Sequence, residues 1–387
     1  MNEKIYTSEE RILTTLAHKE PDRIPFDLGS LSTGGITLKA YKALLEVLGI
    51  EKRNIEIAHV SQQLAKVHED VLTRLNVDTR GFEPLNISRR EQKIEKKGDY
   101  YVYNDEFGIV RSMPVDGGFY FDMTEFPLSG EIDIQRVNDY PYPDHRQWIN
   151  SEKLRKDIID KYNQTNCATI IRGSTIVVER VLFLRGFEDG LMDFAGNFDI
   201  LSALIDRILE NRILFWEKVI DAVGDVVHIM SLNDDLAGQE SLLFSPEVYR
   251  KYVKPMHKKI FSFIKERAPN VKILLHSCGS VYGLIGDLIE IGVDILNPVQ
   301  VSARDMDPKK LKNEFGDDIV FWGGGVDTQY VLPQGTPDEV RNDVKRRIDD
   351  FAPGGGFVFN TVHNIQEDVP PENIIAMWET LMEYGKY

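Results

Sequence analysis

The chain has 387 residues, of which 42% are hydrophobic and 28% charged, a globular composition that allows one large barrel or two to three domains. Its formal net charge of −16 at pH 7 disfavours nucleic acids and anionic membranes as partners. Two cysteines, Cys167 and Cys278, are too few for a disulfide framework. We find no apolar stretch that would span a bilayer and no signal core within residues 1–10, so the sequence predicts a reduced, cytoplasmic protein.

Eight short apolar segments are predicted to form strands. They cover residues 23–28, 77–82, 168–173, 226–232, 272–277, 293–297, 319–323 and 356–361. Helical patterns separate or follow the last six of these strands, at residues 178–223, 246–267, 281–291, 308–314, 337–351 and 371–384. Strands that alternate with helices lie parallel. Eight of them in this length predict an α/β fold, a (β/α)8 TIM barrel, with a doubly wound open sheet as the alternative.

Residues 84–164 interrupt the alternation of strands and helices. Residues 99–104 and 108–113 alternate between apolar and polar side chains, with a short polar segment between them. This pattern predicts an antiparallel hairpin, and a stretch rich in proline and aspartate follows it. We therefore expect a single barrel domain over residues 1–387 that carries a β-rich insertion after its second strand.

Polar residues follow the last five predicted strands, at the point where each strand ends. In a barrel these carboxyl ends meet at one mouth, where active sites lie. Because unpaired polar groups are costly to bury, we expect a ligand or a metal ion at this mouth. The residues concerned are Asn233, Asp234, Asp235, His276, Cys278, Asn297, Gln300, Gly323, Gly324, Gly325, Asp327, Asn360, His363, Asn364, Glu367 and Asp368.

The pair His276 and Cys278 at the end of the fifth strand is the most informative motif. The two side chains face the same way if the strand stays extended, and an imidazole with a thiolate makes half of a zinc site. Zinc needs at least a third protein ligand. His363 is the better choice, because Cys167 precedes the third strand and so lies at the opposite end of the barrel. Three such ligands would leave one position open, as a catalytic zinc requires, whereas a buried, inert pair is the alternative.

Charged residues at the mouth have both functional and structural interpretations. Asp234 and Asp235 are adjacent, so their side chains diverge in an extended segment, and at most one is expected to enter the site as a general acid or base. Capping of the next helix is the alternative, but Ser245 is better placed to provide that cap. Arg80 and Arg172 lie near the ends of the second and third strands and could bind a carboxylate, although surface ion pairs are at least as common.

Glycine and asparagine residues at the mouth suit a larger ligand. Gly323 and Gly324 permit close approach of a phosphate or of the edge of a corrin, although such glycines also form plain turns. Asn297 and Asn360 end the sixth strand and the eighth strand. We expect these four residues to contact a cofactor.

Five stretches of the chain resemble uroporphyrinogen decarboxylase-like proteins. The resemblance implies a (β/α)8 barrel, in agreement with the predicted strands. It also implies one of two activities, because the superfamily contains cofactor-free decarboxylases and corrinoid-dependent methyltransferases. The stretches are RILTTLAHKEPDRIPFDLG, DDLAGQESLLFSPEVYRKYVKPMHKKI, LLHSCGSVYGLIGDLIEIGVDILNPVQ, GGGVDTQYVLPQGTPDEV and FVFNTVHNIQEDVPPENI.

The sequence departs from the pattern of the true decarboxylases. Those enzymes carry an Arg-Gln-Ala-Gly-Arg motif that holds the porphyrinogen carboxylates, whereas residues 27–35 here contain no arginine. A pigment with eight carboxylates needs cationic partners in its cleft. The departure argues against decarboxylation of that substrate.

The methyltransferases of the superfamily bind zinc through a His-x-Cys pair and a later Cys. His276 and Cys278 match the pair, and the later Cys falls at His363. The resemblance thus implies transfer of a methyl group between a small O-, N- or S-methyl compound or thiol and the cobalt of a corrinoid (cobalamin) on a partner protein. A metal-free decarboxylase or lyase that uses Asp235 and arginines on a smaller acid is the alternative. A non-catalytic corrinoid- or porphyrin-binding protein is the third hypothesis, and a homodimer stays open.

Overall fold

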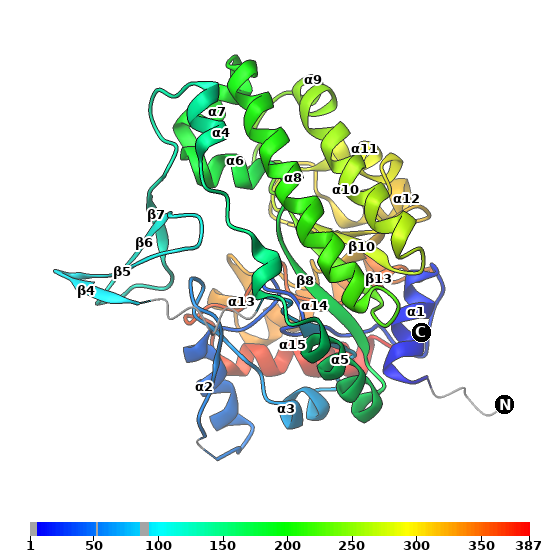
Figure 1. Ribbon diagram of the computed structural model, residues 1–387. Coiled ribbons are helices and arrows are strands. Elements are labelled where there is room, and N and C mark those ends of the chain that lie inside the picture. Colours follow the sequence, from blue (N-terminus) through cyan, green and yellow to red (C-terminus); the bar gives the residue numbers. More distant parts are fainter. Residues whose placement is uncertain (1–5, 52, 86–92) are drawn as a thin grey trace.

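The computed structural model describes residues 6–51, 53–85 and 93–387 (Figure 1). Seven parallel strands form one curved sheet in the order β13-β12-β11-β10-β9-β8-β3. Each strand coincides with a predicted one. They are β3 (Thr79–Phe82), β8 (Ala168–Thr175), β9 (Ile229–Asn233), β10 (Lys272–His276), β11 (Ile295–Asn297), β12 (Val320–Trp322) and β13 (Phe357–Val358).

The segment around Phe26 closes the sheet into a barrel. Phe26 forms a parallel bridge with Phe359, directly after β13, and the backbone N–H of Asp27 donates to the carbonyl of Phe359 over 2.9 Å. On its other side, the N–H of Asp78 donates to the carbonyl of Phe26 over 2.8 Å, directly before β3. Residues 23–28, the first predicted strand, therefore occupy the eighth strand position of the barrel. The (β/α)8 prediction is confirmed, and the open sheet is wrong.

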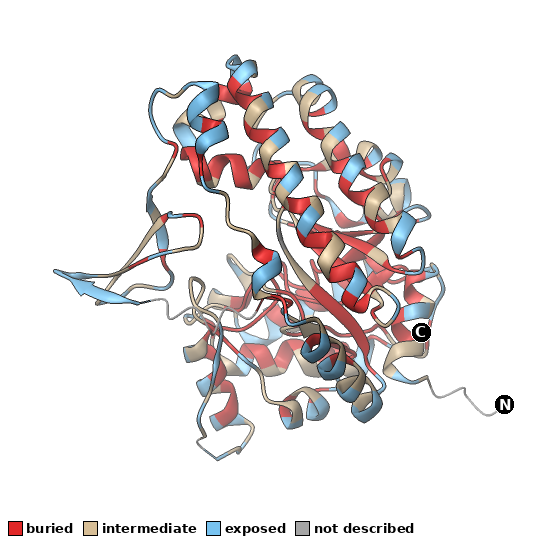
Figure 2. Cartoon of the chain, in the orientation of Figure 1, coloured by how far each residue is buried: buried red, intermediate tan, exposed pale blue. Residues whose placement is uncertain are grey.

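Helices surround the barrel, and buried residues concentrate in the strands and on one side of the helices (Figure 2). The predicted helix 178–223 divides into three: Gly186, with a φ of +85°, separates the first two, and Gly196 and Asn197 separate the second from the third. No helix within the described ranges combines the length and the apolar character that crossing a membrane requires. The helices after β8 are α6 (Val178–Arg185), α7 (Phe187–Ala195), α8 (Phe198–Val223), α9 (Pro246–Val248), α10 (Lys254–Arg267), α11 (Ile285–Glu290), α12 (Pro308–Phe315), α13 (Val331–Gln334), α14 (Pro337–Phe351) and α15 (Pro371–Tyr384). A π-helical turn (Tyr249–Val253) joins α9 to α10.

The amino-terminal part of the chain adds short elements to this barrel. The early helices lie on either side of a two-stranded antiparallel pair that precedes β3. These elements are α1 (Ser8–Leu16), α2 (Leu38–Val47), β1 (Ile57–His59), β2 (Leu64–Ala65) and α3 (Glu69–Arg74).

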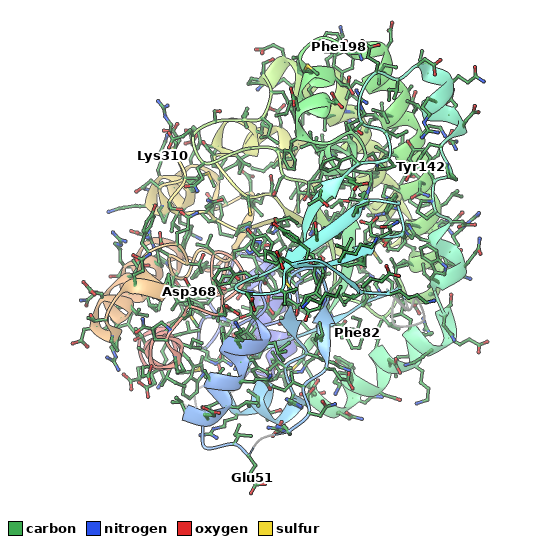
Figure 3. The ribbon with its side chains drawn as sticks, turned by 90° about the vertical axis from the view of Figure 1, so that its left-hand side faces the viewer. Glu51, Phe82, Tyr142, Phe198, Lys310 and Asp368 are labelled. Atoms are coloured by element: carbon green, nitrogen blue, oxygen red, sulfur yellow. The ribbon has the colours of Figure 1, made fainter. Side chains whose placement is uncertain are left out.

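The insertion between β3 and β8 contains a four-stranded antiparallel sheet, which stands away from the barrel in Figure 1. The predicted hairpin is confirmed as β5 (Tyr100–Asn104) and β6 (Val110–Pro114). Two strands were not predicted, β4 (Glu95–Lys97) and β7 (Asp122–Glu125), because their largely exposed polar residues show no apolar alternation. Figure 3 views the molecule from the side of this sheet, with Phe82 at the end of β3 labelled beneath it.

The insertion continues on the way back to the barrel. Its remaining elements are α4 (Ile134–Asp139), a 3-10 turn (His145–Trp148) and α5 (Ser151–Thr165). Residues 86–92 of the predicted insertion 84–164 lie outside the described part of the chain.

The interior of the barrel changes from apolar to polar along its axis. A compact apolar cluster fills one end, with Ala168, Ile170, Ile229, Leu274, Ile295, Val320 and Val358 among its members. Because side chains two residues apart face the same side of a strand, the next inward positions lie nearer the carboxyl ends. All of these positions but Trp322 are polar, and they comprise Arg172, Ser231, His276, Asn297 and Asn360. The barrel thus presents chemistry at its mouth on an apolar floor.

Asp78 links the segment 23–28 to the rest of the barrel. Its carboxylate has no exposed surface and accepts from Arg11 over 2.7 Å, from Arg23 over 2.8 Å and from the N–H of Phe26 over 2.8 Å. Removing one member of a buried ion pair leaves the other charge uncompensated and costs about 3–5 kcal/mol. We therefore expect Asp78→Ala to lower the thermal unfolding midpoint by at least about 5 °C.

The matched control is Lys156→Gln, which breaks the exposed ion pair with Asp160 on α5. Exposed pairs contribute little, so this variant should unfold at the wild-type temperature. Equal thermal unfolding midpoints for the two variants would show that Asp78 does not hold the segment 23–28 in place.

Candidate metal centre at the barrel mouth

The structure brings His276, Cys278 and His363 together at the mouth. One potential ligand atom from each residue lies within 4.8 Å of the other two. Nε2 of His276 lies 3.4 Å from Sγ of Cys278, and the imidazole rings of His276 and His363 are 5.9 Å apart. In tetrahedral zinc coordination, a nitrogen ligand and a sulfur ligand are about 3.5 Å apart. The three side chains therefore fit a zinc ion with little movement.

Asn297 determines which nitrogen of His276 is available. Its Nδ2 donates to the carbonyl of Trp322 over 2.8 Å, which turns its Oδ1 toward the imidazole. Nδ1 of His276 then donates to this Oδ1 over 2.7 Å, so that Nε2 carries a free lone pair on the side of Cys278. Asn297, predicted to contact a cofactor, lies behind a candidate ligand and orients it. Such partners commonly accompany a metal-binding histidine.

Burial sets the protonation states of the three side chains. It lowers the pKa of His363 to about 3, with a contribution from the neighbouring His276, and it lowers the pKa of His276 as well. Both imidazoles are therefore neutral at pH 7, the form that binds metal. Burial also raises the pKa of the Cys278 thiol well above its usual value, and Asp235 adds to this shift.

Asp235 faces this group of side chains. Its Oδ1 accepts from the backbone N–H of Cys278 over 2.7 Å and lies 3.9 Å from Nε2 of His276. Burial raises the pKa of its carboxyl, although the side chain is still 38% exposed. A carboxyl with a raised pKa beside candidate metal ligands is suited to exchange a proton with a bound substrate.

Asp234 is engaged elsewhere. Its carboxylate has no exposed surface and accepts from the backbone N–H groups of Val178 over 2.9 Å and Glu179 over 2.8 Å, in the first turn of α6. Nε2 of His257, on α10, donates to it over 2.7 Å. Asp234 therefore binds the first turn of α6 and does not cap the helix that follows it, α9, which Ser245 caps as expected. A catalytic role for Asp234 stays a prediction that these contacts disfavour.

Packing requires glycine at Gly323 and Gly324, whatever ligand binds nearby. Gly323 adopts a φ of +95°, and a Cβ there would lie 3.2 Å from Nδ2 of Asn297. Gly324 adopts a φ of +82°, and its Cβ would lie 2.9 Å from the carbonyl oxygen of Val299. Asn360 is buried and donates to the Asp27 carboxylate over 2.7 Å. Contact of these residues with a cofactor stays a prediction.

Other polar groups at the mouth bind the backbone. Oε1 of Gln300 accepts from the N–H of Gly279 over 2.8 Å, and Oδ1 of Asn364 accepts from the N–H of Gly35 over 2.6 Å. Their burial therefore needs no ligand. The side chains of His276, Cys278 and His363 remain available to an external partner.

Glu179 is a residue of the mouth that sequence reasoning missed. It lies in the first turn of α6, and its Oε2 is buried without a hydrogen-bond partner among the described residues. Burial raises the pKa of its carboxyl well above the usual value, and Asp235 and Asp234 add to the shift. Within the sequence it belongs to an ordinary helical pattern, so only its place one helical turn beyond the third strand could have indicated it.

The orienting role of Asn297 is testable. Asn297→Leu removes the acceptor for Nδ1 of His276, so the imidazole is free to rotate or to change tautomer. Loss of such a partner typically weakens metal binding 10- to 100-fold. Competition with a chromogenic chelator measures the zinc affinity. Asn211→Ala, which loses a hydrogen bond to the carbonyl of Pro143 far from the mouth, should bind zinc as the wild type does.

The different environments of the two acids predict different phenotypes. Asp234→Ala leaves several buried N–H groups without an acceptor and should cost at least about 2 kcal/mol of stability. Asp235→Asn keeps the acceptor for Cys278 and should leave the unfolding midpoint unchanged while it impairs turnover. Thermal unfolding of both variants checks this, and a more destabilised Asp235→Asn would reverse the assignment.

Comparison with known proteins agrees with this architecture. The family model for uroporphyrinogen decarboxylase (URO-D) matches residues 181–384. Uroporphyrinogen decarboxylases from Prochlorococcus marinus and Synechocystis sp. are both 27% identical to the chain, over 191 and 186 residues. These alignments cover 49% and 47% of the chain, and the same shares of the relatives, so the chain spans about half the length of the curated relatives it matches.

A solved structure extends the likeness to the whole barrel. A methyltransferase from Methanosarcina mazei has a TM-score of 0.63 at 17% identity, and the alignment covers 98% of this chain and 99% of that one. At this identity the likeness shows a shared fold. Since the family model covers more than half of the sequence, the chain belongs to the uroporphyrinogen decarboxylase family.

Proposed function

We propose that the protein is a zinc-dependent methyltransferase that works with a corrinoid-binding partner protein. The observation that carries the proposal is the convergence of His276, Cys278 and His363 at the mouth, with ligand atoms within 4.8 Å of one another. A methyl group would move between the heteroatom of a small O-, N- or S-methyl compound or thiol and the cobalt of the corrinoid. A barrel of the same fold in a protein named as a methyltransferase is consistent with this activity.

The donor set suits the chemistry. Two neutral imidazoles and one thiolate leave a coordination position open for a substrate heteroatom. Zinc bound there would act as a Lewis acid on that heteroatom. Asn297 holds His276 in position, and Asp235 would supply the proton that the heteroatom gains when it loses its methyl group, or accept it in the reverse direction.

A metal-free decarboxylase or lyase is the second candidate. The curated relatives are named as decarboxylases, and the half-buried Arg172 at the mouth could hold a carboxylate. The absence of arginine from residues 27–35 argues against a substrate with many carboxylates. This candidate needs no metal, so metal content separates the two.

The first test is the zinc content of the protein purified without added metal. We expect near-stoichiometric zinc in the wild type and its loss in Cys278→Ala and His363→Ala, because each variant removes one of three ligands. Cys167→Ala is the matched control, since Cys167 is buried beside Val77 and Thr165, away from the carboxyl ends of the strands. This variant should retain zinc.

Methyl transfer to free cob(I)alamin, followed by its absorbance spectrum, then tests the reaction with a panel of methyl ethers, methylamines and thioethers. Zinc that is lost only in Cys278→Ala would remove His363 from the ligand set. A protein without metal even after incubation with zinc would refute the methyltransferase proposal and favour the decarboxylase.

A further inference from the structure

Two arginines near the mouth differ in how their charge is compensated. Arg80 forms an ion pair with Glu69 at 2.6 Å and also donates to the backbone carbonyls of Val77 and Thr79, so its donors are occupied. Arg172 donates from Nε to the carbonyl of Ser30 over 2.9 Å and from Nη2 to the carbonyl of Gly29. Within the described ranges no carboxylate lies within 4.0 Å of the Arg172 guanidinium. Its charge therefore lacks a direct counter-ion.

The position of Arg172 places it inside the barrel. It lies on β8, two residues after Ile170 of the interior apolar cluster, so its side chain starts on the inner face. The strand register aligns Arg172 with Ser231 of β9 and, through it, with Leu274 of β10. His276 is two residues further along β10. Because neighbouring strands are about 4.8 Å apart and two residues of strand span about 6.6 Å, the Cα atoms of Arg172 and His276 are roughly 12 Å apart at the mouth.

The nearby carboxylates compensate Arg172 only without direct contact. Asp27 and Glu83 both act electrostatically on the guanidinium, but neither forms an ion pair with it, and the oxygens of Asp27 accept four hydrogen bonds from other groups. Burial raises the pKa of Glu83 to about 7, so this carboxyl is only partly ionised at neutral pH. A half-buried guanidinium without a full counter-ion is costly, and an anionic ligand would remove that cost. The remaining N–H groups of Arg172 are not bonded within the described residues and suit a carboxylate.

His59 adds a second donor near Arg172. Its Nδ1 accepts from the Ser61 hydroxyl over 3.1 Å and from the N–H of Gln62 over 3.4 Å, so the proton is on Nε2. Burial lowers the pKa of His59 to about 4, and the charges of Arg111 and Arg172 contribute. His59 is therefore a neutral N–H donor within electrostatic reach of the Arg172 guanidinium.

We infer that Arg172 binds a carboxylate of the substrate, with its methylated heteroatom held by His276, Cys278 and His363, two strands further around the mouth. The substrate class is a small organic acid that carries an O-, N- or S-methyl group at the end away from its carboxylate. The inference deepens the proposed function and rests on it for the methyl group. The carboxylate site itself depends only on Arg172 and its surroundings.

The length of the loop that follows the segment 23–28 supports this arrangement. Ser30 binds Arg172, and the Thr33 hydroxyl donates to Oδ1 of Asn297 over 3.4 Å, which in turn holds His276. Three residues of extended chain span at most about 10 Å. One short loop thus touches both ends of the proposed substrate site. The two ends of the site therefore lie within the reach of a small acid.

Isothermal titration of the zinc-loaded protein tests the inference. The probes are 4-methoxybenzoate and its uncharged analogue 4-methoxybenzamide, whose rigid ring keeps the two functional groups at opposite ends. We expect the acid to bind at least tenfold more tightly than the amide, and Arg172→Gln to abolish this difference. Arg155→Gln, which breaks an ion pair with Asp225 on the surface, should retain it.

The wild-type comparison does not depend on the folding of any variant, so equal affinities for acid and amide overturn the inference. Unfolding midpoints and zinc contents show whether Arg172→Gln is folded, and Arg172→Lys keeps the charge but loses the paired donors. Arg172-dependent binding without methyl transfer to cob(I)alamin would refute the methyltransferase proposal alone. Equal kcat/KM values for methyl transfer from the acid and from the amide would refute the carboxylate site alone.

Discussion

The barrel closes through residues 23–28, which form a single bridge to Phe359, directly after β13, and the Asp27 carboxylate reinforces this closure. Asp27 has no exposed surface. It accepts from the Thr79 hydroxyl over 2.7 Å, from Nε1 of Trp322 over 3.0 Å and from Nδ2 of Asn360 over 2.7 Å. These donors lie on β3, on β12 and directly after β13. One buried carboxylate therefore links the segment 23–28 to three neighbouring parts of the barrel. These side-chain hydrogen bonds take the place of a longer series of backbone hydrogen bonds.

The loop that follows the segment 23–28 contacts both Arg172 and Asn297, the partner of His276. The N–H of Ser30 donates to Asp27 over 3.3 Å, and its carbonyl holds Arg172. A Cβ at Gly81 would lie 2.0 Å from that carbonyl oxygen, so the loop reaches this depth only because residue 81 is glycine. Thr33 then reaches Asn297. Displacement of the loop would move Arg172 and loosen the partner of His276 together.

The sequence allowed the strands and the three candidate ligands to be predicted, because apolar runs and the position of a residue at a strand end are local properties. The tasks of individual polar residues were beyond its reach. Asn297 was expected to contact a cofactor, which stays a prediction, and its hydrogen bond to His276 was not foreseen, since only the folded chain brings the carbonyl of Trp322 to its amide. Asp234 and Asp235 are neighbours in sequence, but the start of α6 binds only the first. Strands β4 and β7 lack the alternation that reveals a half-buried strand.

Burial has the same effect on the candidate ligands and on the nearby acids of the mouth, because it favours their uncharged forms. Burial keeps the two imidazoles neutral and raises the pKa of Cys278, Asp235 and Glu179, so the uncharged forms of these five groups are favoured. A divalent cation would reverse this, because its charge lowers the pKa of thiols and carboxyls nearby. A metal-free decarboxylase would gain little from two neutral imidazoles beside a protonated thiol. The arrangement makes chemical sense once a cation completes it, and this favours a metal-dependent reaction, such as the proposed methyl transfer, over a metal-free one.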